Sequence, residues 1–198
     1  MLVKTLISGF GGQGVISMGL ILAQAAMLAD MCVTYLPSYG AEVRGGTANC
    51  TVAVSDEEIA SPIASSPDFV IAMNQPSLAR FQNQIKSGGL LFLNSSLIQS
   101  DPSRDDIEVV RVAADAIAKE VGSARSANMV MLGAFIRVSS IVSLEGIMEG
   151  LRGTMKNKHK LIAVNEKAIN AGYTAIRLDK SRGASRCARY GLPDQVGQ

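Results

Sequence analysis

The sequence has few cysteines, one histidine and no tryptophan, and these shortages remove several classes of function. Its three cysteines, Cys32, Cys50 and Cys187, lie far apart and form no C-x-x-C pair, so neither a zinc site nor an iron–sulfur cluster is predicted. The single histidine, His159, stands among three lysines on a predicted helix and is expected at the surface rather than as a base. We therefore predict no metal ligands and no catalytic residues in this chain.

Charge is also scarce, at 18% of the 198 residues, against roughly 25% in an average soluble chain. The formal net charge of +2 comes from residues 179–198, which hold four basic and two acidic side chains. A neutral body with nine aromatic residues does not fit a nucleic-acid-binding protein. Residues 1–43 carry only Lys4, Asp30 and Glu42 as charged side chains, which indicates a surface that a partner buries.

No segment is apolar for long enough to cross a membrane. The longest apolar stretch, Val15–Ala29, is interrupted by Ser17 and Gln24 and is shorter than the ~20 residues that a membrane span needs. The absence of a disulfide framework favours a reducing, cytoplasmic setting.

Short apolar runs alternate with helical segments along the chain. Strands are predicted at 2–8, 32–36, 47–55, 69–73, 90–93 and 107–112, and helices at 15–29, 76–85 and 114–121. The chain then reads as helical, with starts at Asn128 and Ser143 and a stop at Gly172. This order predicts an α/β fold, a three-layer, Rossmann-like sandwich with a mainly parallel sheet and packed C-terminal helices. We expect one domain over 1–178 and a mobile basic tail over 179–198.

A glycine cluster, Gly9-Phe10-Gly11-Gly12-Gln13-Gly14, satisfies G-x-G-x-x-G between the first strand and the first helix. In that context, exposed backbone amides and a helix N-terminus can hold an anion. A nicotinamide dinucleotide is disfavoured because the next strand ends in Leu36-Pro37-Ser38, without a carboxylate for the ribose. An NTPase loop is excluded since Val15, not lysine, follows the last glycine. Glycines that serve only a tight turn stay an alternative.

The segment 37–46 is the second unusual cluster, rich in glycine and polar residues. Glu42 and Arg44 are two residues apart and lie on the same side of an extended chain, and Gly45 allows another backbone to approach. With Ser38 and Tyr39 beside them, these residues favour a recognition loop over a solvated loop that carries a local ion pair.

Two further polar groups follow apolar strands, at Asn74-Gln75 and at Asn94-Ser95-Ser96. In a parallel sheet, these groups, the glycine cluster and the segment 37–46 all lie along the carboxyl edge. Open α/β sheets bind ligands at that edge.

The glycine cluster through Val15, together with the segment Pro37–Cys50, closely resembles the gamma subunit of 2-oxoacid:ferredoxin oxidoreductases, and the resemblance covers about residues 2–172. It implies a non-redox subunit, inactive alone, of an enzyme that converts a 2-oxoacid, coenzyme A and oxidised ferredoxin into an acyl-coenzyme A, CO2 and reduced ferredoxin. Thiamine diphosphate and the iron–sulfur clusters would belong to partner subunits, and this sequence lacks the signatures of both.

The resemblance further implies alpha, beta and ferredoxin-like delta partner subunits and a shared coenzyme A site. The implied binding residues are Gly11, Gly12, Gln13, Gly14, Ser38, Tyr39, Glu42, Arg44, Gly45 and Asn74. The second segment looks more like subunits of the 2-oxoglutarate or branched-chain type than of the pyruvate type, and 2-oxoglutarate is favoured. A free-standing NAD(P)-dependent dehydrogenase and a purely structural scaffold stay as alternatives, and a homodimer of the isolated chain stays open.

Overall fold

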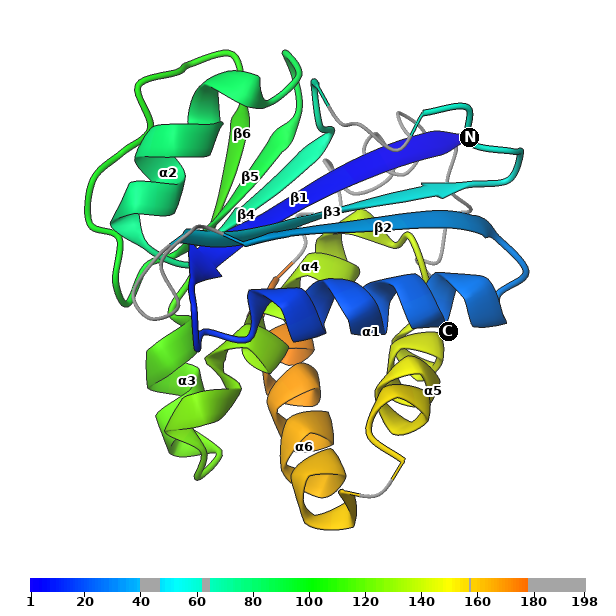
Figure 1. Cartoon of the computed structure of the whole chain (residues 1–198). Coiled ribbons are helices and arrows are strands. Elements are labelled where there is room, and N and C mark those ends of the chain that lie inside the picture. The colour runs from blue at the N-terminus through cyan, green and yellow to red at the C-terminus, as the bar shows by residue number, and fades with distance from the viewer. Residues whose placement is uncertain (40–46, 62–64, 157, 178–198) are drawn as a thin grey trace.

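A computed structural model describes residues 1–39, 47–61, 65–156 and 158–177. In this part of the chain, six strands form one sheet of order β2-β3-β1-β4-β5-β6, with helices on both faces (Figure 1). The strands are β1 Leu2–Phe10, β2 Cys32–Tyr39, β3 Thr47–Ser55, β4 Phe69–Ala72, β5 Leu90–Asn94 and β6 Glu108–Val112. The α-helices are α1 Val15–Leu28, α2 Gln75–Phe81, α3 Ala114–Glu120, α4 Ala127–Ser139, α5 Leu144–Thr154 and α6 His159–Ala175, and Gln82–Gln84 and Ala124–Ser126 form short 3-10 turns.

The sheet is mainly parallel, as predicted. The pairs β1–β4, β4–β5 and β5–β6 are parallel, whereas β3 runs antiparallel to both of its neighbours, β1 and β2. The first residue of β3, Thr47, therefore pairs with the last residue of β1, Phe10. The start of β3 thus lies at the same edge as the carboxyl ends of the other strands.

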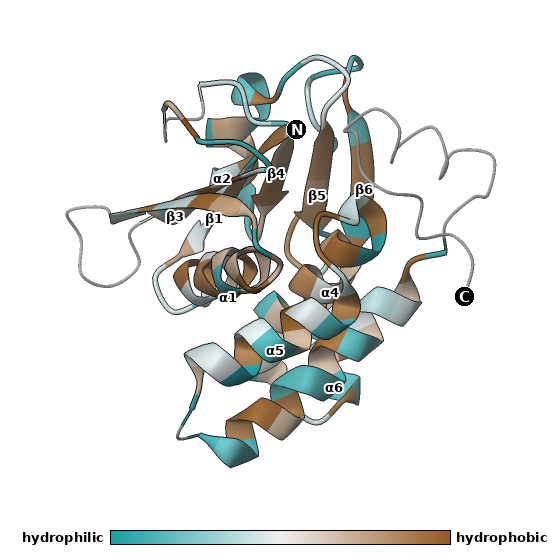
Figure 2. Cartoon of the chain, turned by 90° about the vertical axis from the view of Figure 1, so that its right-hand side faces the viewer, coloured by the Kyte–Doolittle hydropathy of each residue, from teal (hydrophilic) through white to brown (hydrophobic). Residues whose placement is uncertain are grey.

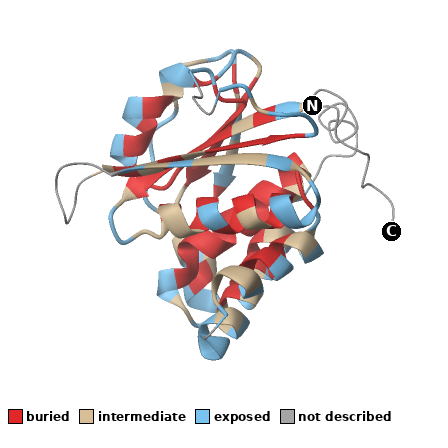
Figure 3. Ribbon diagram, turned by 45° about the vertical axis from the view of Figure 1, so that its right-hand side comes forward, coloured by how far each residue is buried: buried red, intermediate tan, exposed pale blue. Residues whose placement is uncertain are grey.

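Helices cover the sheet on both sides, which confirms the three layers. On one face, Leu78 and Phe81 of α2 pack with Val70 and Leu91 of the central strands. The larger core faces α1, α3, α4, α5 and α6, and there the rings of Phe69, Phe92 and Phe135 pack together, with centroids 5.3–6.4 Å apart. Strands β4 and β5 are buried on both faces, and all of their residues are apolar except Asn94 at the end of β5 (Figures 2 and 3).

Among the C-terminal helices, α5 starts where the sequence predicts, but α6 does not stop there. Ser143 caps α5, since its hydroxyl accepts a hydrogen bond from the Gly146 amide at 3.0 Å. The predicted stop at Gly172 is wrong, because α6 continues to Ala175. Gly172 is instead a packing residue: a Cβ at this position would lie 1.8 Å from the Val130 carbonyl oxygen of α4.

Other predicted boundaries shift as well, and β1 continues to Phe10 rather than ending at Ser8. Pro37 and Ser38 belong to β2, because an edge strand has a free side on which a proline without an N–H is tolerated. The helix predicted at 76–85 ends at Phe81 and continues as a 3-10 turn. Helix α4 begins at Ala127, one residue before the predicted start at Asn128.

Candidate functional site: the carboxyl edge between β1 and β4

The chain leaves β1 and β4, which are neighbours in the sheet, toward opposite faces. After β1 the chain enters α1 on the larger helical face, and after β4 it enters α2 on the other face (Figure 1). Such a divergence is a topological switch point, where open α/β sheets bind their ligands. The segments that leave the sheet here are the glycine turn, residues 10–14, and Met73-Asn74.

The glycine turn exposes its backbone. The Gln13 amide donates to the Phe10 carbonyl at 3.0 Å and closes the turn. Gly12 has φ +98° and Gly14 has φ +71°, backbone conformations that favour glycine. Gly11 and Gly12 are exposed, and a Cβ built at Gly12 has no atom of the described residues within 4 Å. The turn therefore presents main-chain atoms to the outside, directly before the N-terminus of α1.

The Gln13 side chain holds this turn from within. Its Oε1 accepts hydrogen bonds from the Phe10 amide at 2.7 Å and from Asn74 Nδ2 at 2.8 Å, and its Nε2 donates to the Met73 carbonyl at 3.4 Å. Asn74 is 4% exposed, and its Oδ1 caps α2 by accepting from the Ser77 amide at 3.0 Å. Gln13 and Asn74, two of the predicted binding residues, therefore use their side chains for internal hydrogen bonds that hold the glycine turn and the start of α2 in place.

Two further buried asparagines, Asn94 and Asn128, are not among the predicted binding residues but also hydrogen-bond to the segments that leave β1 and β4. Asn128, at the start of α4, donates from Nδ2 to the Gly14 carbonyl at 3.1 Å. Asn94, at the end of β5, donates to the Met73 carbonyl at 3.3 Å and to Asp115 Oδ2 at 2.6 Å. The sequence marked Asn128 only as a helix start and gave no signal for Asp115, because such contacts depend on how α3 and α4 pack on the sheet.

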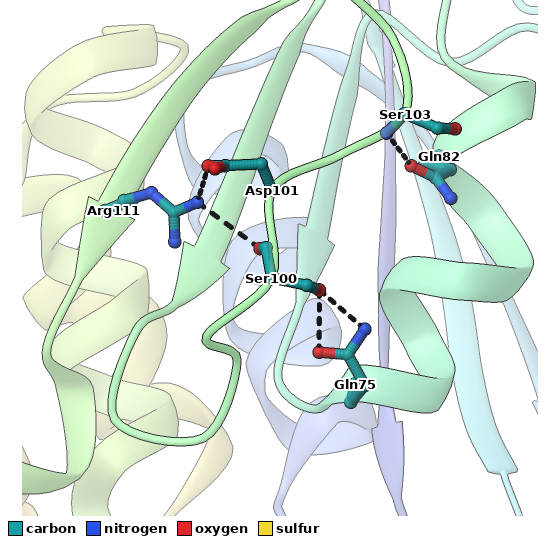
Figure 4. A network of polar contacts seen from close by, with 6 residues as sticks. All are labelled: Gln75, Gln82, Ser100, Asp101, Ser103 and Arg111. Carbon is teal, nitrogen blue, oxygen red and sulfur yellow. Dashed lines mark hydrogen bonds and ion pairs between the residues drawn. The ribbon is translucent and has the colours of Figure 1, made fainter.

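The far end of the same edge is closed by the protein's own side chains (Figure 4). Gln75 and Ser100 exchange hydrogen bonds of 2.8 and 3.0 Å, and Ser103 donates its amide to Gln82 Oε1 at 2.8 Å. Arg111 pairs with Asp101 and donates to the Ser100 carbonyl. The loop after β5 is thereby tied to α2 and β6, which leaves the β1 end of the edge as the candidate site.

The second predicted segment is described only in part, since Glu42, Arg44 and Gly45 lie outside the described residues. Ser38 is exposed and pairs with Asn49, which in turn pairs with Ser8 of β1. It is therefore two strands, or roughly 10 Å, from β1. The backbone of Tyr39 pairs with Ala48. Chain order and register thus bring Ser38 and Tyr39 to the edge that also carries Gly11–Gly14.

Arg80 is a cation at this edge that the sequence did not single out. Its Nη1 donates to Thr47 Oγ1 at 3.0 Å, and its guanidinium lies 5.2 Å from the centre of the Phe81 ring. Thr47 pairs with Phe10 at the start of the glycine turn. Arg80 therefore joins α2 to the start of β3, close to the candidate site.

The described residues offer little for catalysis. They contain no group of three or more His, Cys, Asp or Glu residues that could hold a metal ion. Burial raises the pKa of the Cys50 thiol to about 12, which keeps it protonated and unreactive, and His159 is exposed, as predicted. None of the described helices is both long and apolar enough to span a bilayer. The exposed backbone of the glycine turn, directly before the N-terminus of α1, suits the binding of an anion.

An α/β sheet with an exposed glycine turn at its switch point defines a Rossmann-like binding domain. The particular family follows from sequence: residues 4–175 match the family described as pyruvate ferredoxin/flavodoxin oxidoreductase, and the chain belongs to that family.

Relatives of known name give the same result. The chain is 40% identical over 172 residues to the ketoisovalerate oxidoreductase subunit VorA of Methanothermobacter marburgensis, and this match covers 86% of the chain and 36% of VorA. It is 36% identical over 156 residues to the 2-oxoglutarate synthase subunit KorC of the same organism, covering 75% of the chain and 84% of KorC. The chain thus spans about a third of the length of VorA and most of the length of KorC.

Solved structures share the fold. The gamma subunit of a keto/oxoacid ferredoxin oxidoreductase from Geobacter sulfurreducens has a TM-score of 0.78 at 28% identity, over 88% of this chain and 95% of the other. The 2-oxoglutarate:ferredoxin oxidoreductase from Magnetococcus marinus, with 2-oxoglutarate, coenzyme A and succinyl-CoA bound, has a TM-score of 0.79 at 26% identity, over 90% of this chain and 32% of the other. These matches confirm the resemblance to oxidoreductase gamma subunits and the fold. They do not single out 2-oxoglutarate as the substrate type.

Proposed function

We propose that this chain is the non-redox gamma subunit of a 2-oxoacid:ferredoxin oxidoreductase in the cytoplasm. The complex converts a 2-oxoacid, coenzyme A and oxidised ferredoxin into an acyl-coenzyme A, CO2 and reduced ferredoxin. Thiamine diphosphate and the iron–sulfur clusters sit on alpha, beta and ferredoxin-like delta partner subunits. The isolated chain is inactive, because it lacks the groups that would perform the decarboxylation and the electron transfer.

The chain contributes to the coenzyme A site through the glycine turn. One observation supports this role most: the turn is exposed at the switch point and is already fixed by Gln13, Asn74 and Asn128. A preorganised turn pays little ordering entropy when a ligand binds. The Gly11 and Gly12 backbone and the N-terminus of α1 favour a negatively charged group, such as a phosphate of coenzyme A.

The end of β2 and the segment that follows it complete the site from another side. The residues that contact the catalytic partner and the coenzyme here are Ser38, Tyr39, Glu42, Arg44 and Gly45. Among them, Arg44 binds two oxygens of a phosphate or carboxylate at once. Gln13 and Asn74 belong to the site as residues that position the turn, in keeping with their internal hydrogen bonds.

For the substrate, we propose a 2-oxoacid with a larger side chain than that of pyruvate. Relatives named for ketoisovalerate are 40% and 39% identical to this chain, and 2-oxoglutarate relatives reach 36%, against 28% for a pyruvate synthase subunit. Both 2-oxoglutarate and a branched-chain 2-oxoacid therefore stay as candidates, and partner subunits would decide between them.

The test is affinity purification of this chain from its own cells under anaerobic conditions. The eluate is assayed for dye reduction that depends on coenzyme A and on each of a panel of 2-oxoacids. We expect thiamine- and cluster-bearing subunits to co-purify with such activity, and the preferred 2-oxoacid to identify the substrate. A lone inactive chain that binds NAD or NADP would contradict the proposal in favour of a free-standing dehydrogenase. If the substitution of Gly12 or Arg44 changes neither the partner subunits that co-purify nor the activity, the chain would be a purely structural scaffold.

A further inference from the structure

Helix α1 exposes apolar side chains along one side. Leu20 is 42% exposed, Met27 59% and Leu28 51%, and Ile16 on the same side is half-buried. These residues fall within about a third of the helix circumference, given 100° per residue. Figure 2 shows α1 nearly end-on, coloured brown over much of its circumference. Ser17 and Gln24, both half-buried, lie in the same arc. The exposed side of α1 is therefore mostly apolar and carries no charged side chain, unlike that of an ordinary surface helix.

The apolar side of α1 continues onto the edge of the sheet. Strand β2 is the outermost strand and lies beside α1, where the Tyr35 hydroxyl donates to the Ile16 carbonyl at 2.9 Å. Val33 and Tyr35 are half-buried on the face that packs toward α1. We call this combined area the α1–β2 surface, and it consists of Ile16, Leu20, Met27, Leu28, Val33 and Tyr35.

The α1–β2 surface lies in a stretch almost without charge. Between Lys4 and Glu42, the only charged side chain is Asp30. Depletion of charge together with aromatic and methionine side chains is characteristic of the buried centre of protein interfaces. Exposed leucines occur elsewhere, but Leu161 of α6, 51% exposed, directly follows Lys158, His159 and Lys160. Composition thus separates the α1–β2 surface from an ordinary solvated face.

The surface adjoins the candidate coenzyme site. Helix α1 starts at Val15, immediately after the glycine turn, and β2 ends at the same edge of the sheet. A protein bound along α1 and β2 therefore reaches the glycine turn at one end of its footprint. A site shared between two polypeptides requires this arrangement.

We propose that the α1–β2 surface binds the catalytic, thiamine- and cluster-bearing part of the oxidoreductase, and this inference rests on the proposed function. The length of VorA and of the Magnetococcus marinus chain supports this occupant, because the domain makes up only 36% and 32% of those polypeptides. A domain held permanently against a larger partner has an apolar, extensive interface. A second copy of this chain fits less well, since Pro37 removes one N–H from β2 and weakens strand pairing between copies.

The test introduces one charge into the surface. Leu20→Glu and, independently, Met27→Glu place a carboxylate at exposed helical positions, where the fold tolerates it. Leu161→Glu is the matched control, since Leu161 has a similar exposure on a different helix. Each tagged full-length variant is purified anaerobically from its own cells, and the amount of partner subunit per chain is measured with the thermal midpoint and oligomeric state of the isolated chain.

We expect Leu20→Glu and Met27→Glu to lower partner recovery at least tenfold, with an unchanged thermal midpoint, and Leu161→Glu to leave recovery unchanged. Full recovery of partners with both α1 variants would overturn the proposed interface while the proposed function stands. A variant that converts a dimer of the isolated chain into a monomer, with partner recovery intact, would assign the surface to a second copy and also overturn it. A wild-type chain that captures no partner would overturn both proposals.

Discussion

The glycines of the turn and the glycines of the helical layer are required for opposite reasons. At Gly12 the backbone has φ +98°, and a Cβ would meet no atom within 4 Å in the described part of the chain. At Gly133 of α4 and Gly172 of α6 the backbone is helical, but a Cβ would lie 1.9 Å from the Ile169 carbonyl oxygen and 1.8 Å from the Val130 carbonyl oxygen. The turn needs glycine for its conformation, whereas the helices need glycine for space.

This difference separates a binding feature from a packing feature. A packing glycine lets two backbones touch and contributes to the stability of the chain. An exposed glycine with a positive φ and open space around it contributes little to packing. Its role is to leave the backbone of the turn accessible to a ligand. Substitutions of glycines of both kinds, and of the side chains that contact them, test this separation.

Gly172→Ala should have the largest effect on stability. The added methyl group overlaps backbone atoms of α4 that no side-chain rotation can move, so α6 must shift. We expect the free energy of unfolding to fall by more than the ~1–3 kcal/mol of ordinary overpacking, as measured by chemical denaturation of the isolated chain. Gly153→Ala in α5 is the control, because its Cβ would lie 3.7 Å from Gln24 Cγ. It should be neutral or stabilising, by up to ~1 kcal/mol, and a similar loss at both positions would contradict the packing explanation.

Gly14→Ala should destabilise the chain both through backbone strain and through steric overlap. Its φ of +71° disfavours alanine, and its Cβ would lie 2.3 Å from Asn128 Nδ2. We expect a loss of roughly 2–3 kcal/mol, from about 1–2 kcal/mol of backbone strain and a disturbed buried hydrogen bond. In a double-mutant cycle with Asn128→Ala, the combined loss should be smaller than the sum of the single losses, because the second substitution removes the overlap. Simple additivity would show that the two side chains do not meet.

Gln13→Ala should destabilise the chain by about 1–2 kcal/mol, because the Phe10 amide and Asn74 Nδ2 lose their shared acceptor. Gln13→Glu keeps an acceptor oxygen and should cost less. Denaturation of both variants measures the stability, and coenzyme A titration of the assembled complex measures the function. If Gln13 acts only by holding the turn, the KM for coenzyme A should follow the stability order. A larger KM for the glutamate variant than for the alanine variant would indicate direct contact with the phosphate.

The last effect is confined to alkaline pH and concerns Cys50, whose Sγ lies 2.4 Å from the position that a Cβ at Gly19 would take. Alkylation mapped by mass spectrometry should modify exposed Cys32 and spare Cys50 in the folded chain. Burial raises the pKa of Cys50 from 9.0 to about 12, so the unfolded chain loses this proton first. Above pH 9 the free energy of unfolding should therefore fall by up to ~1.4 kcal/mol per pH unit. Cys50→Ala should remove this dependence, and a variant that retains it would refute the assignment.

Much of the fold was predictable because local signals agreed with the final arrangement. The alternation over Thr47–Val52 reflects one-sided burial, and the apolar runs that became β4 and β5 reflect two-sided burial. The alternation did not predict that Ala53 and Ser55, at the end of β3, are buried as well. The antiparallel direction of β3 was not predicted, since the direction of a strand depends on how the preceding segment crosses the sheet edge. The predicted helix stop at Gly172 was wrong for a similar reason, because a glycine can either end a helix or allow two helices to pack closely, and the local sequence does not distinguish the two.

The sequence predicted where in the fold the candidate site lies, but not the contacts that its residues make. The glycine turn and Asn74 follow strands, so chain order alone brings them to one edge. The inward hydrogen bonds of Gln13, the reach of Arg80 to Thr47 and the contact of Asn128 with Gly14 connect residues 3, 33 and 114 positions apart. The last two depend on helix placement and side-chain direction, which no local pattern specifies.

The most direct measurement of the central claim is a coenzyme A titration of the assembled oxidoreductase that carries Gly12→Ala. We expect this complex to assemble normally and to have a KM for coenzyme A raised about tenfold, or ~1.4 kcal/mol of binding free energy, with an unchanged KM for the 2-oxoacid. The Gly153→Ala complex should match the wild type in both constants. An unchanged KM for coenzyme A in a fully assembled Gly12→Ala complex would contradict a binding role for the glycine turn.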